Sequence, residues 1–169
     1  NPRVGRQPKL TPQKQPQELT AEEAARKIGR KVYFATGSAT PISMVPLIRR
    51  YAVEREGRTD AFFMSTFASA VNFKPELKEK FHAVLLFISM SNRDAATGGW
   101  TTMPRDNLFS LGKRLRANEF GIDTIVVRVS PPDENGMVSL GTTGDTTMPA
   151  VESVIARGKG VFSLAHLPI

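Results

Sequence analysis

The sequence predicts an α/β domain with an open, mainly parallel β-sheet that is flanked by helices. Short β-branched and aromatic runs alternate with stretches whose apolar residues recur at helical spacing. The run at residues 83–88 is entirely apolar, as expected for a strand that is covered on both faces. Strands that are separated by helices imply right-handed crossovers, and these connections produce parallel sheets.

The first predicted element is a helix that begins after Thr20, because two acidic residues follow this threonine and a short apolar face ends near Gly29. Residues 31–36 read as a strand that runs through a tight turn into a helix. Thr40 is the expected cap of that helix and Pro41 its first residue, which leaves Pro46 in conflict with the second turn. Further strands are expected at residues 61–67, 82–89, 124–129 and 160–164, and further helices at residues 104–118 and 146–157.

Composition limits the classes of function. The chain has 169 residues, of which 40% are hydrophobic, and this suits one domain of ordinary size. It has no cysteine and only two distant histidines, so no metal site is expected, and the cytoplasm or the mitochondrial matrix is the expected location. No apolar run approaches the roughly 20 residues that cross a bilayer, so we expect a soluble protein with no membrane partner.

The positive charge is concentrated at the start of the sequence. The net charge is +7, and four basic residues precede the first acidic residue, so the rest of the chain carries +3. Residues 1–17 are also rich in proline and glutamine and contain no aromatic residue. We therefore expect residues 1–17 to be a disordered or partner-wrapped arm that can touch RNA or a large assembly, and residues 18–169 to form the folded domain.

The turn at residues 37–41, GSATP, is the first candidate binding site. It joins a strand to a helix, where backbone N–H groups and the start of the helix can face an anionic group or a thioester carbonyl. It lacks the glycine pattern of nucleotide-binding loops and the lysine of a P-loop, so an ordinary strand-to-helix turn is the alternative.

Residues 129–141, VSPPDENGMVSLG, form the most specific feature. Two prolines stiffen the exit from a buried strand, Asp133 and Asn135 suit a turn, and Gly136 can adopt a positive φ. Local physical chemistry on its own favours a rigid turn with no further role.

The same segment resembles the Ser-Pro-Pro-Asp…Gly…Ser-Leu-Gly signature of the acetyl-CoA hydrolase/transferase family, which includes acetate and 4-hydroxybutyrate CoA-transferases. Residues 32–48, VYFATGSATPISMVPLI, are similar to the first strand and the Gly-x-x-Thr-Pro turn of that family. Residues 141–145, GTTGD, fit the approach to its next helix. The resemblance spans roughly residues 20–160, and it implies that coenzyme A is bound by Gly37, Ser38, Thr40, Pro41, Pro132, Asp133, Gly136, Gly141 and Asp145.

The resemblance implies the N-terminal half of a two-domain enzyme that moves coenzyme A between carboxylic acids without a metal. A glutamate of the second half, which is not among these residues, attacks the acyl thioester, and backbone donors stabilise the oxyanion. The expected partner is such a half or a further copy of the chain. Glu134 is the alternative nucleophile, because related CoA-transferases carry theirs in a Ser-Glu-Asn-Gly sequence, but in the family resembled most closely this position shapes the turn.

A second hypothesis treats the chain as a catalytically inactive CoA-transferase-like subunit of a larger assembly, such as a mitochondrial ribonucleoprotein. The basic arm motivates it. Residues 89–113 also follow the pattern of the family only loosely. In that region Trp100 can either stack on a ligand or anchor a loop, and Arg93 and Arg105 can meet phosphates or remain solvated.

Overall fold

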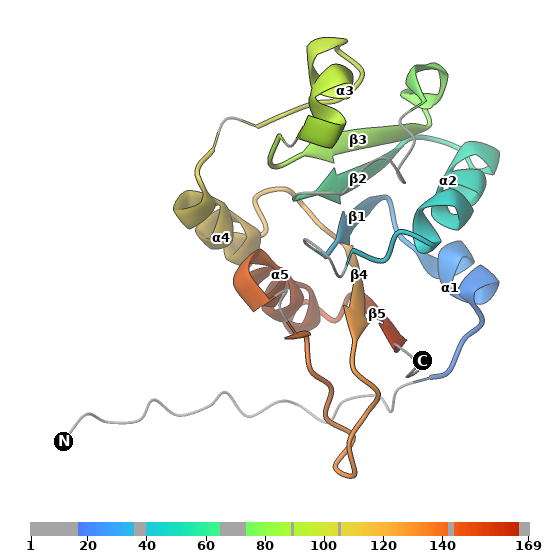
Figure 1. Cartoon of the computed structure of the whole chain (residues 1–169). Coiled ribbons are helices and arrows are strands. Elements are labelled where there is room, and N and C mark those ends of the chain that lie inside the picture. Colours follow the sequence, from blue (N-terminus) through green and yellow to red (C-terminus); the bar gives the residue numbers. More distant parts are fainter. Residues whose placement is uncertain are drawn as a thin grey trace.

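The computed structural model describes residues 17–35, 40–64, 74–88, 90–104, 106–141 and 144–165. Its five strands form one parallel sheet in the order β3-β2-β1-β4-β5 (Figure 1), which confirms the predicted α/β architecture. The strands are β1 (Lys31–Phe34), β2 (Thr59–Phe63), β3 (Phe81–Leu85), β4 (Thr124–Val129) and β5 (Gly160–Ala165). The predicted arm lies outside the described residues apart from Gln17, so it stays a prediction.

Helices cover both faces of the sheet. The helices are α1 (Ala21–Lys27), α2 (Met44–Glu54), α3 (Arg93–Thr97), α4 (Leu108–Ala117) and α5 (Gly144–Ala156), with short 3-10 turns η3 (Pro75–Leu77) and η4 (Met90–Asn92). Helices α1 and α2 lie on one side of the sheet, and α4 and α5 on the other (Figure 1). Alternate strand residues enter the two apolar layers, so Phe34 stacks on Phe63 in one layer while Tyr33 and Phe62 belong to the other. None of the helices within the described ranges is long and apolar enough to cross a membrane.

The start of α1 is confirmed in detail. The Thr20 side chain accepts a hydrogen bond from the backbone N–H of Glu23 at 3.2 Å, and the Glu23 carboxylate accepts one from the backbone N–H of Thr20 at 2.8 Å. This reciprocal capping box satisfies two backbone donors that the helix itself cannot satisfy.

The predicted start of α2 is wrong. Thr40 and Pro41 belong to a turn, and the helix begins at Met44 with Ser43 in the capping position. This later start removes the conflict at Pro46, because Pro46 becomes the third helical residue. The backbone N–H at that position has no acceptor within a helix, so a proline loses nothing there.

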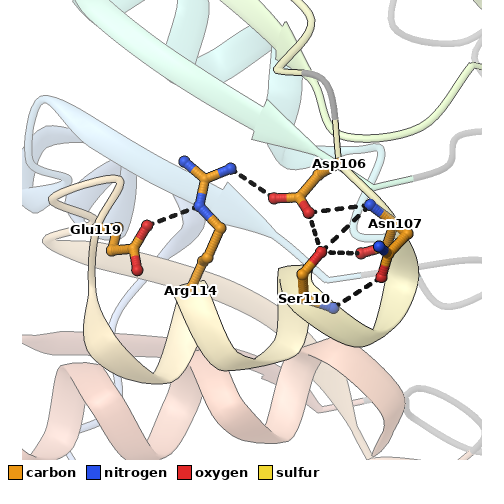
Figure 2. A network of polar contacts seen from close by, with 5 residues as sticks. All are labelled: Asp106, Asn107, Ser110, Arg114 and Glu119. Carbon is orange, nitrogen blue, oxygen red and sulfur yellow. Dashed lines mark hydrogen bonds and ion pairs between the residues drawn. The ribbon is translucent and has the colours of Figure 1, made fainter.

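Helix α4 also begins later than predicted, at Leu108, and Asn107 is its capping residue. The Asn107 side chain accepts a hydrogen bond from the Ser110 backbone N–H at 2.9 Å, and Ser110 in turn bonds back to the Asn107 backbone. Figure 2 shows that Arg114 then links Asp106 at the start of the helix to Glu119 beyond its end, with 2.7 Å between the Arg114 Nε and the Glu119 carboxylate. Side-chain bonds therefore decide where α4 starts, and apolar spacing could not reveal them.

The segment between β3 and α4 was not predicted in this form. It contains η4 and α3, and then runs beside β3, where Thr102 exchanges backbone hydrogen bonds with Leu85 at 2.8 Å and Ala83 at 3.2 Å. Trp100 is 37% exposed, and its ring lies 2.9 Å from the position that a Cβ on Gly98 would occupy. This close approach supports the interpretation of Trp100 as a loop anchor.

Candidate functional site

The candidate site lies where the direction of the strand order reverses. The chain proceeds from β1 outward through β2 and β3, and then returns to place β4 on the other side of β1. Strands β1 and β4 pair in register, with Phe34 beside Val126, and the Ala35 N–H donates to the Val126 carbonyl at 3.0 Å. In open parallel sheets the crevice beyond the carboxyl ends of two such strands is the usual place for a ligand. Both candidate loops of the sequence leave from these two strand ends.

The loop after β1 is described only in its second half. Gly37 and Ser38 lie outside the described residues. Thr40 is 2% exposed and Pro41 is also buried, in a turn whose carbonyls accept from the N–H groups of Ile42 at 2.8 Å and Met44 at 3.1 Å. Their burial indicates that Thr40 and Pro41 support the loop, and direct contact with coenzyme A stays a prediction for both.

The loop after β4, residues 130–141, is held by its own hydrogen bonds and is here called the β4 loop. At its base the Ser130 N–H donates to the Ser139 carbonyl at 3.0 Å, and the Ser139 N–H donates to the Ser130 hydroxyl at 2.9 Å. Near its tip the Asp133 carboxylate accepts from the N–H groups of Asn135 at 2.9 Å and Met137 at 2.8 Å. These bonds fix the shape of a loop that extends well beyond the end of β4 (Figure 1).

The surface of the β4 loop is open to solvent. Pro132 and Glu134 are exposed, and Gly136 has a φ of 74° with no atom within 4 Å of the position that a Cβ would occupy there. Gly141, at the end of the loop, has a φ of 57° and the same open surroundings. Positive φ favours glycine at these two positions whatever space is free around them. The loop is therefore fixed in shape and accessible at the same time.

The start of α5 completes the site on the side of β4. Asp145 is the second residue of this helix, and its side chain lies outside the described residues. The next residue, Thr146, is 4% exposed, and its hydroxyl lies 3.0 Å from the hydroxyl of the fully buried Tyr33 on β1. This contact places the first turn of α5 over the strand from which the other loop leaves.

Sequence reasoning did not identify the contact between the hydroxyl groups of Tyr33 and Thr146 beside the candidate loops. Two signals were available. A tyrosine in a buried strand needs a hydrogen-bond partner for its hydroxyl, and two consecutive threonines stood at an expected helix start. Neither signal says that the two segments meet, because Tyr33 and Thr146 are 113 positions apart.

One described group with a shifted pKa is His82, which lies at the other end of the strands. Burial lowers the pKa of His82, near the amino end of β3, and the positive charge of Arg58 lowers it further. The His82 Nε2 lies 2.7 Å from the Thr102 hydroxyl. Within the described ranges no three His, Cys, Asp or Glu side chains are placed so that they could hold a metal ion.

Comparisons with known proteins agree with this fold. No protein-family model matches the chain. A 4-hydroxybutyrate coenzyme A transferase of Clostridium kluyveri is 26% identical over 137 residues, which cover 80% of this chain and 32% of the relative. The crystal structure of RipA from Yersinia pestis superposes with a TM-score of 0.69 at 19% identity, over 89% of this chain and 44% of that chain.

A 4-hydroxybutyrate CoA-transferase from Porphyromonas gingivalis superposes with a TM-score of 0.57 at 21% identity, over 88% of this chain and 39% of that one. The chain therefore has a CoA-transferase-like α/β fold and a distant sequence similarity to a 4-hydroxybutyrate CoA-transferase. It spans about a third of the length of that curated relative and less than half of each of these two solved structures.

Proposed function

We propose that this chain is the N-terminal-type domain of a CoA-transferase or acyl-CoA hydrolase, and that it holds coenzyme A at the switch point between β1 and β4. One observation carries the proposal: the two segments that resemble family motifs leave from the carboxyl ends of two paired strands, which is where such sheets bind ligands. The distant similarity to a 4-hydroxybutyrate CoA-transferase supports the same ligand class.

In this proposal the chain binds and orients the substrate while a second half supplies the nucleophile. The carboxylate of a glutamate in that half attacks the carbonyl carbon of the thioester, and the thiolate of coenzyme A leaves, which yields an anhydride. The thiolate then attacks the glutamyl carbonyl of the anhydride, which releases the acyl group as its carboxylate and forms a glutamyl thioester. The expected partner is such a half or another copy of the chain.

The β4 loop is the element of this chain that fits the orienting role. Its backbone is fixed by bonds at both its base and its tip, so it loses little conformational freedom when a ligand binds. The Asp133 carboxylate is already engaged by two backbone N–H groups, which supports a role in shaping the loop. Glu134 is exposed and makes no hydrogen bond or ion pair with the described residues, so nothing positions it as a nucleophile.

The test is isothermal titration of coenzyme A and acetyl-CoA into the purified chain and two glycine variants. Gly136→Val forces a β-branched residue to a φ of 74° in the β4 loop, and Gly158→Val does the same at a φ of 64° beyond the C-terminal end of α5. Both glycines have open space around them, so a valine strains the backbone to a similar degree at each position. Gly136 lies beyond the carboxyl end of β4 and Gly158 before the amino end of β5, so Gly158→Val is the control.

Saturable binding that Gly136→Val weakens and Gly158→Val leaves intact is the expected result. Equal effects of the two variants would mean that the β4 loop has no specific part in binding. A folded chain that binds neither ligand would contradict the proposal. Capture of RNA through residues 1–17 in that case would favour the structural-subunit hypothesis.

A further inference from the structure

The β4 loop contains the pair Asn135-Gly136, whose chemistry makes it open to a spontaneous change. Asparagine is among the thermolabile residues. Its side-chain amide can be attacked by the backbone nitrogen of the next residue, and a glycine leaves this nitrogen uncovered because it has no Cβ. The sequence has six asparagines, and only Asn135 is followed by glycine. The sequence therefore concentrates this reactivity at a single position.

Both residues of the pair are open to solvent. Asn135 and Gly136 are exposed, and no atom lies within 4 Å of the position that a Cβ on Gly136 would occupy. The Asn135 side chain makes no hydrogen bond with the described residues. Water can therefore reach the amide, and no side-chain bond keeps the amide away from the backbone nitrogen of Gly136.

Asp133 opposes the reaction through hydrogen bonds to the same turn. Its carbonyl accepts from the N–H of Gly136 at 2.9 Å, and this is the nitrogen that would attack. Its carboxylate accepts from the N–H groups of Asn135 at 2.9 Å and Met137 at 2.8 Å. The nitrogen must lose its proton and move towards the side chain before it can react, so the bond to the Asp133 carbonyl has to break first. The two carboxylate bonds hold the turn closed against that opening.

We propose that Asn135 is a site of spontaneous deamidation and that Asp133 slows the reaction by holding the turn closed. The Gly136 nitrogen gives up its proton and bonds to the Asn135 Cγ, while the C–N bond of the side-chain amide breaks and the amide nitrogen leaves with a proton as ammonia. Water then opens the cyclic imide to give either aspartate or isoaspartate. Isoaspartate places an extra backbone carbon before the Gly136 nitrogen, so the Gly136 N–H no longer meets the Asp133 carbonyl in the same turn.

The consequence for the candidate site rests on the proposed function. In that function the β4 loop contributes a fixed shape, and an isoaspartate at position 135 removes it, so coenzyme A should bind less tightly. Aspartate at the same position keeps the ordinary backbone and should leave binding intact. The reaction therefore makes the loss of coenzyme A binding a slow and one-way result of the age of the protein.

The test follows the full chain by mass spectrometry of its peptides during incubation at physiological temperature, at neutral and at mildly alkaline pH. Conversion is expected at Asn135 before any other asparagine, and faster at alkaline pH, because the attacking nitrogen must lose its proton. Asp133→Ala should accelerate it about fivefold to tenfold, since two bonds that close the turn are lost. Glu134→Gln removes an adjacent exposed charge without removing these bonds, so it is the matched control and should convert at the wild-type rate.

Two results of this incubation would overturn the proposal. Conversion of another asparagine before Asn135 would show that the site is wrong. Equal rates in Asp133→Ala and in the wild type would remove the role of Asp133.

Titration of coenzyme A into fresh and aged samples tests the consequence for binding. The aged wild type should lose affinity, whereas aged Asn135→Gln and fresh Asn135→Asp should keep it, because neither contains isoaspartate at this position. Equal affinity of fresh and aged wild type, at a stage when Asn135 has been converted, overturns the effect on binding alone. A fresh wild-type chain that binds no coenzyme A overturns the proposed function together with that effect, while the mass measurement still decides the site.

Discussion

The hydroxyl of Tyr33 and the Oγ1 of Thr146 lie 3.0 Å apart in a buried hydrogen bond that joins β1 to the first turn of α5. Tyr33 is 0% exposed and Thr146 is 4% exposed. The bond ties the strand from which the first candidate loop leaves to the helix that the β4 loop enters, so it fixes the geometry of the switch point. Buried polar contacts of this kind define one arrangement of neighbouring elements where apolar packing would tolerate several.

Tyr33→Phe is expected to destabilise the chain by about 1 kcal/mol, because it removes a buried hydrogen bond and keeps the ring. Thermal melting measures the change. The matched control is Tyr51→Phe, since the sequence has only two tyrosines and the Tyr51 hydroxyl bonds Glu22 and Arg50 on the partly exposed surface of α2. A larger loss of stability in Tyr51→Phe than in Tyr33→Phe would contradict the role given to the buried bond.

Asp133→Ala should weaken the binding of coenzyme A while the melting temperature changes little, because it frees an exposed loop and leaves the core intact. Asp133→Asn should retain binding, since its amide oxygen can still accept from the two backbone N–H groups. Glu134→Gln changes the charge of the adjacent exposed residue and should have no effect. Titration of coenzyme A into the three variants tests this. If Asp133→Asn lost as much affinity for coenzyme A as Asp133→Ala, the charge of Asp133 would be what contacts the ligand.

His82 should make the stability depend on pH just below neutrality. Burial, assisted by the charge of Arg58, lowers its pKa below the ordinary value of 6.5, so the folded chain favours the neutral ring. The unfolded chain then binds more protons as the pH falls below 6.5, and stability declines until the lower pKa of the folded state is passed. The charged and polar groups around the ring are Arg58, Asp60, Lys78, Glu79 and Thr102.

Urea unfolding above and below pH 6.5 measures this dependence. His82→Gln should flatten the profile in that window. The sequence has only one other histidine, and His166→Gln is the matched control. A profile that flattens in the control and persists in His82→Gln would show that His82 is not the group responsible.

Arg114→Lys should lower the melting temperature more than Arg116→Lys does. The Arg114 guanidinium binds both Asp106 and Glu119 and lies 4.5 Å from the centre of the Phe120 ring, and a lysine cannot make these contacts together. Arg116 lies on the same helix and makes one exposed ion pair with Glu152, which contributes little. Equal changes in the two variants would mean that the network in Figure 2 does not hold α4 in place.

The same network predicts an acid-sensitive helix. Hydrogen bonds from Ser110 and Arg114 hold the pKa of Asp106 below its ordinary value of 3.8. A lowered carboxyl pKa stabilises the folded state above that value, and the stabilisation is lost as the pH falls through the folded pKa. Asp106→Asn should therefore lower the melting temperature at neutral pH. In acid, where Asp106 of the wild type is protonated, the melting temperatures of variant and wild type should lie closer together, as measured by circular dichroism.

Local sequence signals predicted the elements that local interactions determine. Residues 124–129 form β4 with the predicted bounds, because a β-branched run favours a strand and the Ser-Pro-Pro that follows it ends the strand. The start of α1 was predicted for the same reason, since the partners in its capping box lie within three residues of each other. The starts of α2 and α4 were predicted too early, although the cap of α4 joins residues only three positions apart, because apolar spacing does not mark the capping residue. The bridge between Val84 and Thr102 joins segments that are distant in sequence, and it was not predicted.

The amino-acid sequence by itself therefore determined the alternation of strands and helices and marked the segments at residues 37–41 and 129–141 as candidate loops. Only the tertiary structure showed that the segment at residues 129–141 starts beside the end of β1, because β4 pairs with β1. It alone showed that Tyr33 reaches Thr146. The physical reason is that strand order and the satisfaction of buried polar groups depend on contacts between residues far apart in the chain, which no local pattern records.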